Sequence, residues 1–98
     1  MANLRTISVY NVTLTNANTE YSQELPPNAR ALAVQPRTAV DVRIAFVTGK
    51  VATPTAPYFT MKSGSALALQ DLQLTDGATV YFGTATAGTV VEIVAGSW

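Results

Sequence analysis

Acidic side chains are the first candidates for chemistry in this sequence. Its 98 residues include neither histidine nor cysteine, which excludes a histidine-based triad, a cysteine nucleophile and a Cys/His zinc site. Two carboxylates could still act as the acid and base of a glycosidase. We do not expect such a pair, because the acidic residues lie in turns or on outward strand positions. The six are Glu20, Glu24, Asp41, Asp71, Asp76 and Glu92. The sequence therefore predicts a protein that is not an enzyme and has no catalytic residue, cofactor or metal site.

Thr75-Asp76-Gly77 superficially resembles the active-site triplet of retroviral-type aspartic proteases. That family requires a Thr or Ser between its Asp and Gly, and this spacer is missing here. Asp followed by Gly between two apolar runs is typical of a hairpin turn. We therefore interpret Asp76 as a turn residue.

Exposed aromatic rings would be the signature of a sugar-binding β-sandwich. Tyr58 and Phe59, beside the Pro/Thr-rich segment 48–57, are the one adjacent pair that could form such a platform. The simpler prediction is that one of these rings packs inward and the other shields it. Phe46 and Phe82 follow alternating patterns that place them in the core.

Charge and hydropathy argue against nucleic acid and membrane partners. Six basic and six acidic residues give a formal net charge of zero, and charged residues make up only 12% of the chain. The basic residues are dispersed, whereas nucleic-acid binding needs them clustered. No apolar run approaches the roughly 18–20 residues that span a bilayer, and residues 1–15 are too polar for a signal sequence. We expect no nucleic acid or membrane partner, and assembly in a cytoplasm. Low charge favours association, which predicts a homo-oligomer.

The elements that must position these residues are strands. Segment 39–47 alternates apolar and polar residues, and similar short runs recur at spacings of about 8–12 residues. The pattern predicts a single domain, 1–98, with seven to eight short strands in an antiparallel β-sandwich, jelly-roll-like or Ig-like. Its predicted core comprises Val40, Val42, Ile44, Phe46, Val80, Phe82, Val91 and Ile93.

Two segments are ambiguous. The first strand changes phase between Val9 and Tyr10, which suggests a bulge or a switch of sheets. Segment 63–77 fits two short or bulged strands, with a short helix capped by Ser65 as the alternative.

The C-terminal strand predicts a contact surface. If Val91 and Ile93 fill the core, Val90 and Val94 must project from the opposite face, where a monomer gains little by exposing them. We expect Trp98 to continue this strip and dock on a partner, with Gly96 and Ser97 acting as a flexible joint. The alternative is that Trp98 folds back over its own sandwich. Tyr58 and Phe59 complete the candidate interface.

The two ends of the sequence, "NVTLTNANTEYSQELPPNARALAVQPR" and "GATVYFGTATAGTVVEIVAGSW", resemble small all-β accessory proteins of tailed bacteriophage virions that decorate or cement the head. The resemblance implies a structural protein of the virion that binds the major capsid protein or another virion protein and stabilises the lattice. It also implies a trimer and assembly in the host bacterial cytoplasm. A carbohydrate- or receptor-binding module of a phage tail or fibre is the alternative.

Overall fold

The structure is a computed structural model that describes residues 6–97, and across this range the chain forms only strands, turns and irregular loops. The strands are β1 (Thr6–Leu14), β2 (Tyr21–Leu25), β3 (Ala29–Pro36), β4 (Val42–Ala45), β5 (Phe59–Met61), β6 (Leu67–Leu69), β7 (Ala78–Gly83) and β8 (Thr89–Ser97). The prediction of an all-β fold is confirmed. The short helix proposed for segment 63–77 is wrong, since β6 and a turn occupy it.

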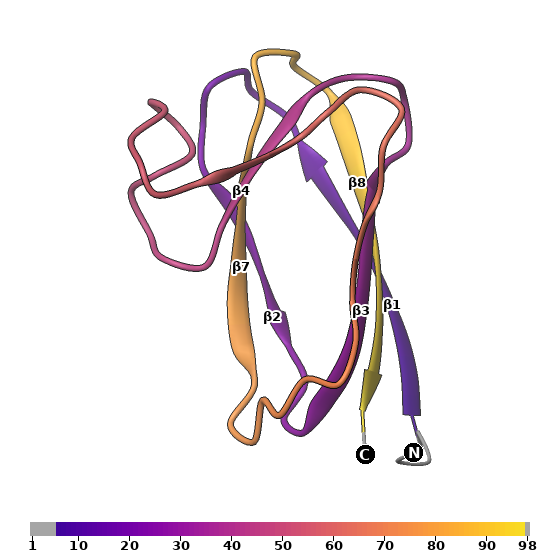
Figure 1. The fold of residues 1–98 in the computed structure, drawn as a ribbon. Coiled ribbons are helices and arrows are strands. Elements are labelled where there is room, and N and C mark those ends of the chain that lie inside the picture. Colours follow the sequence, from indigo (N-terminus) through magenta and orange to yellow (C-terminus); the bar gives the residue numbers. More distant parts are fainter. Residues whose placement is uncertain (1–5, 98) are drawn as a thin grey trace.

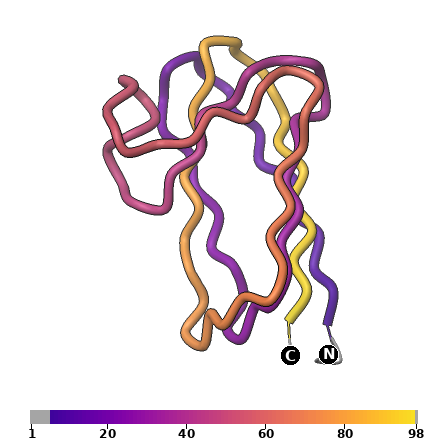
Figure 2. The backbone as a smooth tube through the Cα atoms, viewed as in Figure 1, coloured from indigo at the N-terminus to yellow at the C-terminus, as the bar shows by residue number. Residues whose placement is uncertain are grey.

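The strands form two four-stranded antiparallel sheets, with the orders β1-β8-β3-β6 and β2-β7-β4-β5. Figure 1 shows the two sheets as the layers of a sandwich, and the backbone trace in Figure 2 shows how the loops join them at both ends. The first and last described residues, Thr6 and Ser97, are cross-strand partners. Both ends of the described range therefore lie side by side at one end of the first sheet.

The core lies between the layers and receives one face of each sheet. Leu14, Val34 and Ile93 reach it from the first sheet, and Val80 and Phe82 from the second; all are at most 1% exposed. Of the eight predicted core residues, six are buried: Val42, Ile44, Val80, Phe82, Val91 and Ile93. Val40 is half-buried and packs against this core.

Phe46 is not a core residue, so that prediction is wrong. Its side chain is 50% exposed, because β4 ends at Ala45 and the alternation of side chains ends with the strand. Val51, from the loop after β4, is fully buried instead and packs directly over Gly83. A core position is thus filled by a loop residue that has no periodic pattern around it.

The predicted bulge in β1 is also wrong. Residues 6–14 pair with β8 without interruption, one residue to one residue. Tyr10, Val12 and Leu14 point inward, so Ile7 and Val9 fall on the outer face, where they are 69% and 65% exposed. The change of phase in the sequence marks two apolar residues on the outside of a regular strand. The register does shift in β3, between Ala29 and Ala31.

Asp76 and Gly77 form the turn between the β6 segment and β7, as predicted. Gly77 has a φ of +77°, and a Cβ there would lie 2.7 Å from the carbonyl oxygen of Leu25. The position therefore requires glycine on both conformational and steric grounds. Asp76 is part of this turn.

Candidate partner interface on the outer face of the first sheet

Val90 and Val94 lie on the outer face of β8, as predicted. Their neighbours Val91, Ile93 and Ala95 are fully buried, and the two-residue period of a strand directs the intervening side chains outward. Val94 is 43% exposed, whereas Val90 is half-buried. Since β8 is a central strand, Val94 lies in the middle of this sheet face rather than at its edge.

The register of the sheet places Val94 among further apolar side chains. Val94 lies between Val9 of β1 and Ala33 of β3, and Ala68 of β6 continues the same row. In the next row Ile7, Gly96 and Ala31 are aligned. We define the outer patch as Ile7, Val9, Ala33, Ala68 and Val94. It combines protruding aliphatic groups with small residues on four neighbouring strands and contains no charge.

The small residues leave the outer patch hollowed. One shallow depression of about 190 Å³ is lined by Ile7, Ala33, Ala68 and Val94, among others. A second, of about 370 Å³, lies beside it between Val9, Val94 and Gln35. Apolar residues line most of the first depression, whereas Asn11, Gln35 and Glu92 add polar groups to the second.

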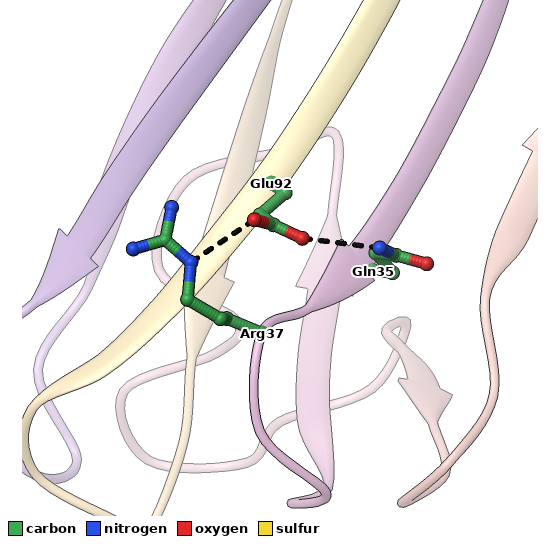
Figure 3. A network of polar contacts seen from close by, with 3 residues as sticks. All are labelled: Gln35, Arg37 and Glu92. Atoms are coloured by element: carbon green, nitrogen blue, oxygen red, sulfur yellow. Dashed lines mark hydrogen bonds and ion pairs between the residues drawn. The ribbon is translucent and has the colours of Figure 1, made fainter.

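The row next to Val94 on the same sheet face, toward Val90, is polar. The Gln35 amide donates a hydrogen bond to Glu92 Oε1 at 3.0 Å, and Arg37 Nε donates to Glu92 Oε2 at 3.0 Å (Figure 3). These two hydrogen bonds, that from Gln35 first, hold the pKa of the Glu92 carboxyl below its ordinary value of 4.5. The cluster keeps the carboxylate charged and fixed, and it gives the apolar patch a polar border.

Ile7 and Val9 are exposed residues of the outer patch that the sequence prediction did not include. The change of phase at this point suggests an interrupted strand, although the alternation with Tyr10, Val12 and Leu14 contains the signal that both residues point outward. Two apolar residues out of phase with three others in one strand mean two apolar faces, if the strand is regular. Ile7 and Val9 are the most exposed large aliphatic residues of the described chain.

Tyr58 and Phe59 do not belong to the outer patch. They lie at the β4–β5 end of the second sheet, where Phe59 is the cross-strand partner of Ile44. Their side chains are 40% and 55% exposed, so the prediction that one of the rings packs inward is wrong. Phe46 and Val47, 50% and 57% exposed, follow β4 at the same end of the ladder. The structure thus holds two separate apolar surfaces where one was predicted.

The predicted joint at Gly96 and Ser97 is wrong. Both residues belong to β8, both are buried, and both pair with β1 on one side and with β3 on the other. Backbone groups held in two ladders cannot act as a hinge. Trp98, the predicted anchor, lies outside the described residues.

Two of the acidic residues, Glu20 and Asp41, hold loops in place. Glu20 accepts hydrogen bonds from the Thr48 hydroxyl at 2.7 Å and from the Gly49 amide at 2.8 Å. Asp41 accepts one from the Ser63 amide at 2.6 Å. Across residues 6–97 no three His, Cys, Asp or Glu residues gather closely enough to hold a metal ion. No helix long and apolar enough to cross a membrane occurs in this range.

Comparison with known proteins gives little beyond this geometry. No protein-family model matches the chain, and no curated protein matches it. Among solved structures, a chain of the disulfide-linked pili of Bacillus endospore appendages is similar with a TM-score of 0.46 and 18% identity, over 94% of this chain and 87% of that one. This sequence contains no cysteine. At this level the similarity supports no conclusion about what the chain does.

Proposed function

We propose that this chain is a structural protein that works by docking its outer patch on another protein. The observation that carries the proposal is the exposure of Ile7, Val9 and Val94 side by side on a regular sheet. Exposure of such a patch to water costs free energy, about 25 cal/mol for each Å² of apolar surface. A protein that buries the patch in an assembly recovers this free energy, and no reactive group is needed for it.

The assembly we propose is the capsid lattice of a tailed bacteriophage, with the major capsid protein as the partner. This part of the proposal depends on the resemblance of the sequence to phage head-decoration proteins. A decoration protein binds at many identical positions and stabilises contacts between capsid subunits. An uncharged docking surface with a polar border suits this task, because it does not require an opposite charge on the lattice.

The test compares two valines of similar exposure on different surfaces. Wild-type protein, Val9→Ser and Val47→Ser are mixed with undecorated head particles assembled from the major capsid protein of a tailed bacteriophage. Particle-bound protein is then measured by sedimentation. Val9 is 65% exposed in the outer patch, and Val47 is 57% exposed in the loop after β4. We expect saturable binding for the wild type and for Val47→Ser, and about tenfold weaker binding for Val9→Ser, the loss of roughly 1.4 kcal/mol. Equal binding of the two variants, or none by the wild type, would contradict the proposal.

A second candidate function is carbohydrate or receptor binding on a phage tail or fibre. The exposure of Tyr58 and Phe59 together favours it, since aromatic rings supply the apolar faces that sugars contact. A glycan-array signal that Phe59→Ala abolishes and Val9→Ser preserves would favour this function over lattice binding.

A further inference from the structure

β1 is a long sheet edge. It has nine residues and is bonded to β8 on one side, and among residues 6–97 no strand pairs with its other side. The three other edges of the sandwich are shorter: β2 has five residues, and β5 and β6 have three each.

The hydrogen bonds at the end of β1 show which backbone groups are free. The Leu14 carbonyl accepts a hydrogen bond from the Gly88 amide at 2.8 Å, so Leu14 directs its backbone toward β8. The Val90 carbonyl accepts one from the Arg37 amide at 2.8 Å, so Val90 faces β3 and leaves its β1 partner, Thr13, unbonded. Because the groups alternate along a regular antiparallel strand, the odd-numbered residues direct N–H and C=O to the open edge. These residues are Ile7, Val9, Asn11 and Thr13.

The features that normally protect an open edge are absent from β1. Its sequence, TISVYNVTL, contains no charged residue and no proline, and its pairing contains no bulge. By contrast, the β2 edge carries the exposed Glu24 and is followed directly by Pro26. An edge that is long, regular and uncharged is suited to pairing with another strand.

We propose that a second copy of this chain occupies the edge, with the two β1 strands pairing antiparallel about a two-fold axis. A second copy fits because it presents an edge of the same length with the same alternation of free groups. The register that overlaps all of residues 6–14 is centred on Tyr10. It opposes Ile7 to Thr13 and Val9 to Asn11, so every free residue meets another free residue.

The pairing joins the two first sheets into one sheet that continues through both copies. A two-fold axis perpendicular to a sheet keeps the faces of both copies on the same side, so the two outer patches face one direction. One dimer would then offer two docking surfaces to a repeating partner, which raises the overall affinity through effective concentration. The edge predicts pairs; a trimer, which the resemblance to phage proteins implies, would need a different contact. The dimer itself does not depend on the proposed function.

The first test removes one free N–H donor from the open edge of β1 and leaves the hydrogen bonds between β1 and β8 intact. Proline at position 11 deletes an N–H that faces the open edge, and it requires an extended residue before it, which Tyr10 already is. Asn11→Ala is the matched control, because it changes the same side chain and keeps the N–H. By analytical ultracentrifugation we expect wild type and Asn11→Ala at twice the chain mass of 10.3 kDa, and Asn11→Pro at the single-chain mass. A monomeric or trimeric wild type, or a dimeric Asn11→Pro, would overturn the proposal.

The second test needs no variant and applies even if Asn11→Pro does not fold. Amide hydrogen exchange is measured on wild-type protein at high and at low concentration. The amides of Ile7, Val9, Asn11 and Thr13 should exchange at least about tenfold faster after dilution, whereas those of Tyr10 and Val12, bonded to β8, should not change. Fast exchange of the odd-numbered amides at every concentration would show that the edge stays open.

Discussion

The fold lowers the pKa of the Glu92 carboxyl. Gln35 and Arg37 each donate a hydrogen bond to its carboxylate, so its pKa is lower in the folded chain than in the unfolded one. A depressed pKa means that the carboxylate stabilises the fold fully above the unfolded value of 4.5. The stabilisation is lost as the pH falls through the lower folded value.

The corresponding prediction concerns Glu92→Gln. The difference in the free energy of unfolding between wild type and this variant should be constant above about pH 5.5 and shrink below pH 4.5. Urea denaturation across this range measures it. Gln35→Met, which removes one of the two donors, should weaken the pH dependence without abolishing it. A difference that does not change with pH would mean that Glu92 is not held as described.

A second prediction at this scale uses two phenylalanines. Phe82 is fully buried, so Phe82→Ala should lower the free energy of unfolding by about 3–5 kcal/mol. Phe46 is 50% exposed, so Phe46→Ala should lower it by less than about 1 kcal/mol. Thermal or urea denaturation of the two variants compares them directly. A large loss for Phe46→Ala would place that ring in the core after all.

The contrast between these two rings shows what a residue pattern can and cannot predict. The alternation of Val42 and Ile44 correctly gives the inward face of β4. It cannot reveal that the strand ends at Ala45, because the strand's end depends on the loop that follows and on where Val51 inserts. The outward placement of Val90 and Val94 was predictable, because β8 continues past both.

Arg43 anchors the base of the loop after β4, and Gly83 leaves room for the loop. Arg43 Nε donates a hydrogen bond to the Val51 carbonyl at 2.7 Å, and its guanidinium also reaches Asn18 Oδ1 at 3.0 Å. A Cβ at Gly83 would collide with the Val51 carbonyl oxygen and lie 2.8 Å from its carbonyl carbon. The loop can therefore close over β7 because position 83 lacks a side chain.

Gly83→Ala should consequently displace the loop. We expect a loss of about 1–3 kcal/mol in the free energy of unfolding and faster proteolysis within residues 48–57. Arg43→Met should also increase proteolysis of the loop, because it removes the hydrogen bonds without crowding Gly83. Unchanged proteolysis in both variants would show that the loop is anchored by other contacts.

The end of β8 supports a second prediction at the scale of elements. Deleting residues 96–98 removes Gly96 and Ser97 from two ladders, so the melting temperature should fall. Trp98→Ala keeps both ladders and tests the ring alone. If Trp98 is a docking anchor, Trp98→Ala should weaken particle binding at an unchanged melting temperature. A lower melting temperature with normal binding would instead mean that the ring covers the sandwich.

At the scale of the whole molecule, the formal net charge of zero makes a prediction about binding. Docking through the outer patch should be insensitive to ionic strength, since salt screens charges and leaves the burial of apolar surface intact. Particle binding measured in roughly 50 mM and 500 mM sodium chloride should therefore agree within a factor of about two, because the screening length shrinks severalfold over this range. A steep loss at high salt would point to charged contacts elsewhere.

The fold class and the single core could be predicted from strand spacing and from alternation in segments such as 39–47. The arrangement of the sheets could not, because β1 pairs with β8 from the opposite end of the chain. Such pairing depends on which partner fits each inner face, and no local pattern contains that information. For the same reason, Val9 and Val94 become neighbours only once the fold is known.

The neighbouring positions of Thr6 and Ser97 have a mechanical consequence. Tension between the two ends of the chain would act across the β1–β8 ladder, along its hydrogen bonds rather than along its strands. The bonds would then break one after another, like a zipper, instead of sharing the force. A sandwich of this kind is a poor link in a chain pulled end to end, whereas force spread over its sheet faces would leave that ladder unstrained.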